Sequence, residues 1–299
     1  MRILKFNGKP KHRDIVIVLG NFDGVHVGHR KLILEAVKYS KKHRLPCYAM
    51  TFDPHPQEVI SPKRGLSLLT TLSERIELMR SLGVDGVIVK AFNKNIAKMP
   101  PETFIRHFLV GELKARKVFV GYDFAFGHKR TGTISMLKRL GSKYGFRVNA
   151  VKPVMTHGHV VKSSTIRDML TRGDFSKAIK LLGHPYTITG KVVKGRGRGR
   201  GLGFPTANLK LEDDKLVPKH GVYFCKWNGR KCVVNIGSRP TFAEERFAVE
   251  VHIPGFHGNL RGKTIEVQLL KKLRDEIHFA DVEDLKAQIR KDIRKLKAD

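Results

Sequence analysis

Short apolar runs alternate with helix-spaced apolar positions along the first part of the chain. The run 15–19 is rich in β-branched residues, which predicts a buried strand. Further apolar runs predict strands at 47–52, 87–89 and 118–120 and near Val148. Apolar residues at intervals of three and four predict helices around 32–37, 73–82 (with Ser73 as N-cap), 101–108 and 134–140. Strands that alternate with helices in this way favour a parallel sheet covered by helices, an α/β domain.

The pattern changes near Gly183 and His184. Helical spacing ends there, and from Tyr186 onward the chain has short β-rich runs separated by glycine and proline. These runs lie at 186–188, 192–193, 222–224, 233–236, 249–251 and 265–267. They predict a small antiparallel barrel. A terminal amphipathic helix has an apolar stripe that we expect to pack against the barrel, namely Leu285, Ile289, Ile293 and Leu296. The sequence therefore predicts two domains, 1–183 and 184–299.

The charge of the chain is its most unusual overall property. The 299 residues include 58 Lys and Arg against 27 Asp and Glu, a formal net charge of +31 at pH 7. A field of this sign attracts phosphates and nucleic acid. The basic residues are spread along the whole chain without a long basic tail, so we interpret them chiefly as a solvated surface. We expect no more than incidental nucleic-acid binding.

The sequence favours a cytoplasmic protein that does not bind membranes. Its first residues lack the apolar core of a signal peptide, and no uninterrupted apolar run is long enough to cross a membrane. The three cysteines, Cys47, Cys225 and Cys232, form neither a metal-ligand pattern nor a disulfide framework.

The most informative motif follows the first predicted strand. Residues 20–29 are Gly-Asn-Phe-Asp-Gly-Val-His-Val-Gly-His, so His26 and His29 stand where a strand ends and a helix begins. Free backbone N–H groups at a helix start bind anions, and glycines let a ligand approach the backbone. Two imidazoles beside them can donate hydrogen bonds to a phosphate whose charge is growing. The candidate phosphate-binding residues of this turn are Gly20, Asn21 and Gly28.

A metal site is one alternative interpretation of the two histidines. They are three residues apart, which suits one face of a helix, and Asp23 is the further candidate ligand nearby. The other alternative is a strand–helix turn in which the histidines are incidental. We favour phosphate binding because the glycines permit a close approach to the backbone.

Two further segments of the first half carry candidate ligand-binding residues. The three aromatic residues in the segment 121–130 either belong to the core or form the wall of a site for a flat ring system. Ser163 and Ser164 stand at a predicted helix start. They either cap its free N–H groups or, together with Arg167, hold a triphosphate.

The second half has its own phosphate-binding candidate. Gly and Arg alternate over 195–203, and Phe-Pro-Thr-Ala-Asn follows, with Thr206 and Asn208. The segment is not a P-loop, because no Gly-Lys-Ser/Thr follows, and it does not connect a strand to a helix as a dinucleotide fingerprint does. A disordered RNA-binding tract is the alternative. We expect an ordered or ligand-ordered loop, in which Gly199 and Gly201 let the backbone wrap phosphates.

These motifs resemble those of one enzyme family. Gly-Val-His-Val-Gly-His at 24–29 is similar to the nucleotidyltransferases that transfer AMP from ATP. Within them, Gly-Asn-Phe-Asp-Gly-Val-His at 20–26 resembles the bacterial bifunctional riboflavin kinase/FMN adenylyltransferase (FAD synthetase) family. Gly-Phe-Pro-Thr-Ala-Asn at 203–208 resembles riboflavin kinase, as do the segments 235–242 and 249–252. The resemblance covers nearly the whole chain. It implies a Rossmann-like nucleotidyltransferase domain followed by a riboflavin kinase barrel.

The resemblance also implies a role for each motif. His26 and His29 would be catalytic in adenylyl transfer, and Glu250 would accept the proton of riboflavin's hydroxyl. Thr206 and Asn208 would hold Mg²⁺ together with ATP. The implied flavin-binding residues are Phe52, Asp53, Pro56, Asp123, Phe124, Phe126 and Arg274. The chain departs from the family pattern at Lys162, which replaces a serine, and at 259–262, which is Asn-Leu-Arg-Gly where Asp-Leu-Tyr-Gly is frequent.

The sequence thus predicts a bifunctional enzyme of flavin cofactor biosynthesis. ATP would phosphorylate riboflavin to FMN, and a second ATP would adenylylate FMN to FAD with release of pyrophosphate. Two other classes stay open at this point. One is a related enzyme that adenylylates a different phosphorylated metabolite, and the other is a nucleic-acid-binding protein on an inactive enzyme scaffold.

Overall fold

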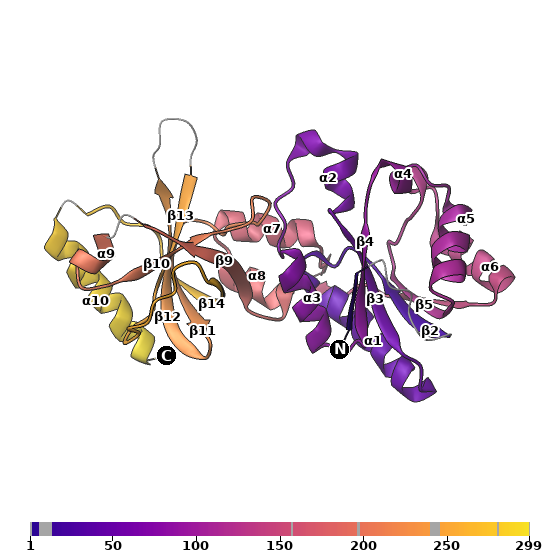
Figure 1. Cartoon of the computed structure of the whole chain (residues 1–299), viewed down its shortest axis with the longest axis horizontal. Helices are drawn as coiled ribbons and strands as arrows, with labels where there is room; N and C mark the ends of the chain where they lie inside the picture. The colour runs from indigo at the N-terminus through magenta and orange to yellow at the C-terminus, as the bar shows by residue number, and fades with distance from the viewer. Residues whose placement is uncertain are drawn as a thin grey trace. The chain divides into compact units, whose positions relative to one another are not determined.

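The computed structural model describes residues 2–5, 14–156, 158–195, 198–239, 246–279 and 281–298. The chain divides into two units, Met1–Ser163 and Ser164–Asp299. Figure 1 shows a sheet flanked by helices in the first unit and a closed barrel with a long C-terminal helix in the second. Within the described ranges, no helix is both long enough and apolar enough to cross a membrane.

A parallel sheet of six strands organises the first unit. Its order is β1-β4-β3-β2-β5-β6, and each neighbouring pair is parallel. The strands are β1 (Arg2–Lys5), β2 (Ile15–Leu19), β3 (Cys47–Asp53), β4 (Gly86–Ala91), β5 (Ala115–Gly121) and β6 (Arg147–Val151). A short hairpin follows, formed by β7 (Met155–Thr156) and β8 (His159–Val160). The predicted α/β domain with a parallel sheet is confirmed.

Helices cover both faces of this sheet. They are α1 (Val27–His43), α2 (Pro56–Ile60), α3 (Leu72–Ser81), α4 (Lys94–Ala97), α5 (Pro101–Phe104), the π-helix η3 (Ile105–Glu112) and α6 (Ile134–Tyr144), with short 3-10 turns η1 (Asp23–Val25), η2 (Pro62–Arg64) and η4 (His128–Arg130). Val16 of β2 packs in one core cluster with Ile33 of α1, whereas Ile17 packs in another with Phe108 and Leu137. Because successive strand residues point to opposite faces, both faces of β2 are buried. That burial explains its uninterrupted apolar run.

Two details of the first unit differ from the sequence-based expectations. Thr71, and not Ser73, is the N-cap of α3. The Thr71 hydroxyl accepts a hydrogen bond from the backbone N–H of Glu74 at 3.2 Å, and the Glu74 carboxylate accepts one from the Thr71 N–H at 3.0 Å. This reciprocal capping box fixes the helix start two residues earlier. The edge strand β1, which pairs with β4, was not predicted at all.

A closed antiparallel barrel forms the core of the second unit, as predicted. Its order is β10-β13-β12-β11-β14-β9. The strands are β9 (Tyr186–Val193), β10 (Thr206–Lys210), β11 (Gly221–Trp227), β12 (Arg230–Arg239), β13 (Arg246–His252) and β14 (Thr264–Arg274), and the short helix α9 (Arg198–Gly201) lies between β9 and β10 in the chain. The runs 186–188 and 192–193 belong to one strand. The apolar pattern does not predict β10.

Three helices accompany the barrel. They are α7 (Ser163–Arg172), α8 (Phe175–Leu182) and α10 (Val282–Ala298). The ring of Phe175 lies 5.1 Å from that of Tyr223 on β11, so α8 packs on the barrel. The predicted stripe of α10 lines a cavity together with barrel residues, through Leu285, Ile289 and Ile293. The side chain of Leu296 lies outside those described.

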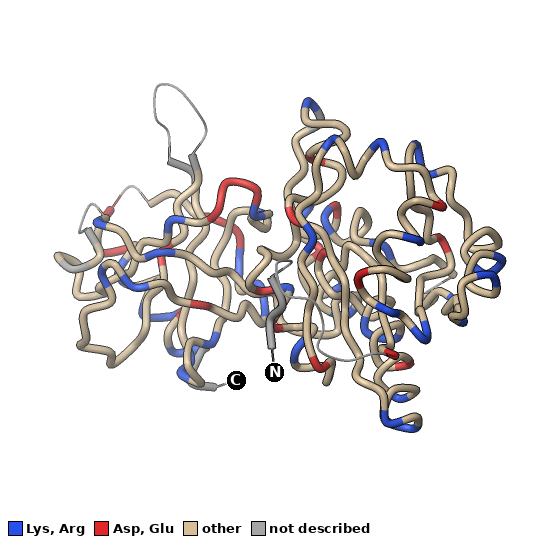
Figure 2. The backbone as a smooth tube through the Cα atoms, turned by 45° about the vertical axis from the view of Figure 1, so that its right-hand side comes forward, with Lys and Arg blue, Asp and Glu red and all other residues tan. Residues whose placement is uncertain are grey.

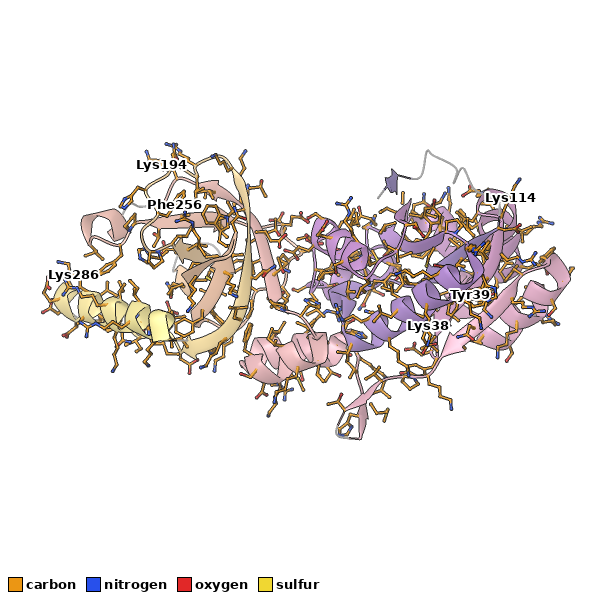
Figure 3. All side chains as sticks on the ribbon, turned by 90° about the horizontal axis from the view of Figure 1, so that it is seen from below. Lys38, Tyr39, Lys114, Lys194, Phe256 and Lys286 are labelled. Carbon is orange, nitrogen blue, oxygen red and sulfur yellow. The ribbon has the colours of Figure 1, made fainter. Side chains whose placement is uncertain are left out.

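Lys and Arg residues are spread over both units, as Figure 2 shows. Lys38 and Tyr39 extend from α1 in Figure 3, and Nζ of Lys117 on β5 lies 5.2 Å from the centroid of the Tyr39 ring. Burial, and secondarily the charge of Arg147, lowers the pKa of Lys117. The distribution agrees with a solvated basic surface. Incidental nucleic-acid binding stays a prediction.

Candidate active sites

The histidine turn connects β2 to α1 in the first unit. His26 is the N-cap of α1, in an extended conformation. Its Nδ1 accepts hydrogen bonds from the backbone N–H groups of Gly28, at 3.2 Å, and His29, at 3.4 Å. An imidazole nitrogen that accepts cannot carry the proton, so the neutral ring carries it on Nε2. The cap therefore leaves His26 with an Nε2–H donor.

The two histidine rings lie face to face. Their centroids are 3.7 Å apart with 18° between the planes, and the ring of Phe22 meets His29 edge-on at 5.4 Å. Burial, then the neighbouring His26, then Arg75 hold the pKa of His29 well below its ordinary value of 6.5. His29 is consequently neutral at pH 7. Arg75 is fully buried on α3 and donates from Nη2 to the carbonyl of Thr70 at 3.3 Å.

Asp23, the metal-ligand alternative, is bound by backbone and hydroxyl donors. Its buried carboxylate accepts the N–H groups of Leu69 and Thr70, at 3.2 and 3.1 Å, and the Thr70 hydroxyl at 3.3 Å. These contacts fix the turn against the loop before α3. Among the described residues, no group of three or more His, Cys, Asp and Glu side chains could hold a metal ion.

The remaining phosphate-binding candidates have different environments. The hydroxyl of Ser163 donates to the carbonyl of Asp23 at 2.9 Å, which ties the start of α7 to the histidine turn. The carbonyl of Asn21 accepts the Thr51 hydroxyl at 3.0 Å. Two close approaches involve glycine: a Cβ on Gly20 would lie 2.9 Å from the Phe22 ring, and one on Gly28 would lie 3.1 Å from the His26 ring. Ser164, exposed, and Arg167, half-buried, lie on α7.

The flavin candidates of the first unit are partly core residues. Phe126 is buried, belongs to the sheet's core cluster and lies 5.6 Å from the ring of Phe124, which is half-buried. Phe52 meets Phe92 edge-on at 5.4 Å. Asp53 and Asp123 are exposed, and Pro56 is half-buried at the start of α2. Core packing therefore explains Phe126. The other five side chains are half-buried or exposed and give an accessible surface at the carboxyl ends of β3 and β5.

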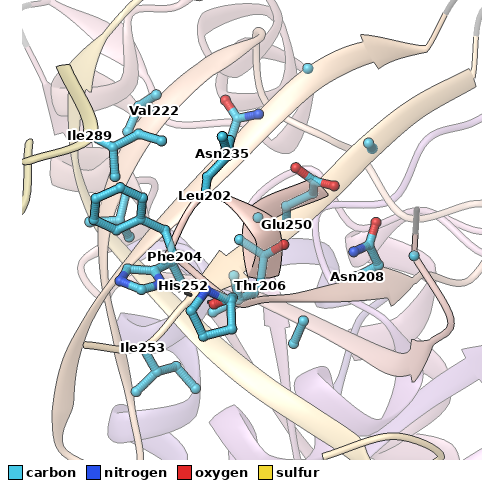
Figure 4. A pocket seen from close by; sticks show the side chains of 18 of the residues that line it. Leu202, Phe204, Thr206, Asn208, Val222, Asn235, Glu250, His252, Ile253 and Ile289 are labelled. Carbon is cyan, nitrogen blue, oxygen red and sulfur yellow. Dashed lines mark hydrogen bonds between the residues drawn. The ribbon is translucent and has the colours of Figure 1, made fainter. Parts of the chain in front are cut away.

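Three polar side chains stand side by side in the barrel. Asn208 of β10 is directly opposite Glu250 of β13, and Glu250 is directly opposite Asn235 of β12. Opposite residues in antiparallel strands point to the same face, with Cβ atoms ~4.5–5.5 Å apart. We call Asn208, Glu250 and Asn235 the polar row. Figure 4 shows the three side chains entering one space.

The polar row faces a cavity of about 1230 Å³ between the barrel strands and α10. The neighbouring residues Leu209, Ile236 and Val249 point the other way and are buried. Thr206 of β10 lines the same cavity beside the row, as Figure 4 shows. The volume exceeds the ~300–1,000 Å³ of typical small-molecule pockets. It therefore has room for a nucleotide and a second substrate.

The Gly/Arg loop passes directly over this site. A Cβ on Gly195 would lie 2.2 Å from Nδ2 of Asn208. One on Gly199 would lie 2.5 Å from a backbone oxygen and 3.2 Å from Oγ1 of Thr206. A side chain at either position would collide with these atoms, so the backbone reaches Thr206 and Asn208 because both residues are glycine.

Arg274, the flavin candidate of the barrel, holds α10. Its Nε and Nη2 donate to Oδ2 of Asp292 at 3.0 and 2.9 Å, and Asp292 is buried. Arg274 also lines the cavity, as do residues 259–261. Open space surrounds Gly201. Several residues of the predicted motifs lie outside the described ranges, namely Arg196, Gly197, Pro240, Thr241 and Phe242.

Two site residues were missed in the sequence. Arg75 has a readable signal, since it occupies an inward position of α3, three residues after Leu72 and four before Met79. A basic residue on the buried face of a helix requires a polar or ligand-related explanation. Asn235 lay inside a recognised motif but had no assigned role. Only the strand register places it beside Glu250.

Both units thus combine a glycine-rich backbone with side chains suited to phosphate groups, which defines a two-domain nucleotide-dependent transferase. Residues 8–165 match the family model of FAD synthetase, and residues 182–298 match that of riboflavin kinase. The chain belongs to the bifunctional riboflavin kinase/FMN adenylyltransferase family. Among its relatives, the enzyme of that name from Escherichia coli K12 is 38% identical over 93% of this chain and 90% of its own length. The one from Buchnera aphidicola of Schizaphis graminum is 36% identical over 96% and 94%.

A solved structure shares the whole architecture. It is described as a macrolide-efflux protein from Streptococcus pneumoniae, is 30% identical, has a TM-score of 0.86 and covers 99% of this chain and 98% of its own. That description names an activity that neither family model carries.

The boundary between the two units differs between the family models and the structure. Nearly all of α8 lies in the gap between the ranges that the two family models match. The two compact units, by contrast, meet between Ser163 and Ser164, before α8. The functional boundary at 183/184 stays a prediction.

Proposed function

We propose that this chain converts riboflavin to FMN in the barrel and FMN to FAD in the α/β unit, each with ATP. The observation that carries the proposal is the polar row: a carboxylate flanked by two carboxamides faces a cavity that a glycine loop overhangs. That arrangement suits the transfer of a phosphoryl group to a hydroxyl. Membership of the bifunctional family supports both reactions.

Glu250 is the proposed base of the kinase reaction. The primary hydroxyl of riboflavin attacks the γ-phosphorus of ATP; the new P–O bond forms as the bond to ADP breaks, and Glu250 accepts the hydroxyl proton. Thr206 and Asn208 lie two residues apart on β10, next to Gly199 and Gly195 of the loop respectively. They are the proposed contacts of the β- and γ-phosphates. Arg274 is a proposed flavin contact at the cavity rim.

The barrel site fits Mg²⁺ that arrives with ATP. The hydroxyl of Thr206, the carboxamide oxygen of Asn208 and the carboxylate of Glu250 are oxygen donors, which Mg²⁺ prefers, and they lie beside one another. Mg²⁺ characteristically uses one or two protein oxygens plus substrate phosphates. Thr206 and Asn208 would hold the ion, which would neutralise the developing phosphate charge.

The histidine turn is the proposed centre of adenylyl transfer. The phosphate of FMN is already ionised, so its oxygen attacks the α-phosphorus of ATP without a base, and the bond to pyrophosphate breaks. His26 donates from Nε2, and neutral His29 adds a second donor to the growing charge. Gly20, Asn21, Gly28, Ser163, Ser164 and Arg167 are the proposed triphosphate contacts. Phe52, Asp53, Pro56, Asp123, Phe124 and Phe126 are the proposed flavin contacts.

A product assay with two single-site variants tests the proposal. Purified protein is incubated with riboflavin, ATP and Mg²⁺, and the flavins are separated by chromatography. Glu250→Gln should lower riboflavin phosphorylation by ~10²–10⁴-fold, the range for a lost general base, while FAD synthesis from added FMN persists. His29→Ala should abolish FAD formation and leave FMN formation largely intact, because His29 belongs to the first unit alone.

A matched control separates the role of Glu250 from the removal of any carboxylate. Glu266→Gln makes the same change at an exposed position of β14, and it should leave both rates at the parent level. Parent-rate phosphorylation by Glu250→Gln would exclude that residue as the base. Equal loss of both activities in folded His29→Ala would contradict the assignment of one reaction to each unit.

A cytoplasmic location stays a prediction.

A further inference from the structure

We propose that Asn235 is a positioning residue that holds the Glu250 carboxylate toward the riboflavin hydroxyl. The inference rests on the proposed kinase function. Its starting point is the register of the barrel, in which Glu250 has a carboxamide directly opposite on each side. Asn208, on one side, is assigned to ATP, whereas Asn235, on the other, has no assigned role.

The pairing geometry brings the two side chains within reach. With Cβ atoms ~4.5–5.5 Å apart, an Asn carboxamide can donate a hydrogen bond to a Glu carboxylate on the neighbouring strand. In Figure 4 the amide nitrogen of Asn235 lies on the side toward Glu250. Both side chains are half-buried, so water would not fully compete with such a hydrogen bond.

The surroundings of Asn235 explain why a carboxamide suits this position. A Cβ placed on Gly237, two residues further along β12, would lie 2.5 Å from the Glu276 carboxylate and 3.5 Å from Nδ2 of Asn235. Glu276 is therefore a second carboxylate near the amide. A neutral amide near both carboxylates adds no charge to theirs, whereas an acidic residue at this position would repel both.

Other charged groups also face the cavity around Glu250. They are Arg274 with its partner Asp292, Glu276 with His220 at 3.8 Å, His252, which contacts the carbonyl of Pro205 at 2.9 Å, and Lys194, His257 and Arg261. Variants of Asn235 leave all of these in place. A change in the pH profile between the parent and such a variant therefore reports on position 235 itself.

Asn235→Ala tests the positioning role. We expect kcat for riboflavin phosphorylation to fall about 10-fold or more while KM for riboflavin stays within about threefold, because the carboxylate loses its orienting donor and the substrate keeps its contacts. In the Glu250→Gln background the same change should have little further effect, since both act on one step. Gln268→Ala, which removes an exposed amide of β14, is the matched control and should change neither constant.

The pH–rate profile of Asn235→Asp is a measurement that would not change if the role of Asn235 were purely structural. A carboxylate directly opposite Glu250 makes the pair harder to ionise fully, so the acidic limb of the kinase pH–rate profile should move to higher pH by on the order of one unit. FAD synthesis from FMN, measured on the same sample, shows that the first unit is intact, and a parent-like thermal unfolding transition shows that the barrel is folded.

The outcomes separate this inference from the proposed function. If Asn235→Ala raises KM and leaves kcat unchanged, Asn235 binds substrate and the positioning role is wrong. An unshifted profile for Asn235→Asp, or full additivity with Glu250→Gln, would also overturn it. If Glu250→Gln itself phosphorylates riboflavin at the parent rate, the proposed base fails first, whatever Asn235 does.

Discussion

His26 has two separable roles, and a pair of substitutions can distinguish them. The ring caps α1 through Nδ1 and is proposed to act on phosphate through Nε2. His26→Ala removes both nitrogens. His26→Asn keeps a side-chain acceptor that suits an N-cap position and removes the Nε2–H donor. The two variants should therefore differ in stability and agree in activity.

The structure sets the size of each effect. Loss of an N-cap costs ~1 kcal/mol, and loss of the ring stacked on His29 at 3.7 Å costs a further ~0.5–1.5 kcal/mol. For a unit of this size, 1 kcal/mol lowers Tm by ~2–4 °C. His26→Ala should thus unfold about 4–8 °C below the parent, and His26→Asn about 2–4 °C below it. FAD synthesis should fall ~10²–10³-fold in both, the range for a lost transition-state donor.

The assay combines thermal unfolding of the first unit with FAD formation from FMN and ATP. His159→Ala, at an exposed position of the same unit, is the control and should match the parent in both measurements. If His26→Asn synthesises FAD at the parent rate, the ring nitrogen Nε2 is not needed. If His26→Ala unfolds at the parent temperature, the capping contacts do not stabilise the unit.

Three further predictions concern pH, cysteine reactivity and the domain boundary. Burial holds the pKa of His29 well below 6.5, so the unfolded chain binds a proton at this residue more readily than the folded chain does. The free energy of unfolding should therefore have its full value above pH 6.5 and decrease as the pH falls below it. In urea titrations, His29→Gln should reduce this dependence on pH. All three cysteines are buried and burial raises the pKa of Cys47 to about 12, so a thiol reagent should label none of them in the native protein and all three in denaturant; labelling of the native protein would contradict the burial. A fragment covering 164–299 should be several kcal/mol more stable than one covering 184–299. Only the longer fragment keeps the buried Phe175 and Leu182 of α8, each of which contributes up to about 2–3 kcal/mol. Equal stabilities would show that α8 adds nothing to the barrel.

Local sequence patterns sufficed where structure depends on near neighbours. The run 15–19 and the spacing of Ile33 and Val37 specify β2 and α1 without reference to the rest of the chain. The cap of α3 is also specified locally: Thr71 and Glu74 have the capping-box spacing, whereas Ile76 stands three residues after Ser73.

Tertiary packing decided what the motifs alone could not. Phe126 lies in an aromatic loop suited to a ring system, yet its ring belongs to the core cluster of the sheet and lies 5.7 Å from the ring of Phe104. Arg274 pairs with Asp292 on α10, 18 residues further along the chain and in the next element. A motif identifies which residues are candidates, but the partner of each side chain depends on contacts that no local spacing contains.

The polar row shows most clearly that local sequence spacing does not specify which side chains meet. Asn208, Glu250 and Asn235 lie on three strands, and β10 itself has strand character only because β9 and β13 pair on its two sides. A slip of one residue in either pairing would turn a side chain of the row to the opposite face. The register is regular through β10, β13 and β12, whereas β11 and β14 pair with irregularities. The proposed chemistry of the barrel therefore depends on strand register as much as on residue identity, and a one-residue insertion within β13 ahead of Glu250 should abolish riboflavin phosphorylation even if the barrel still closes.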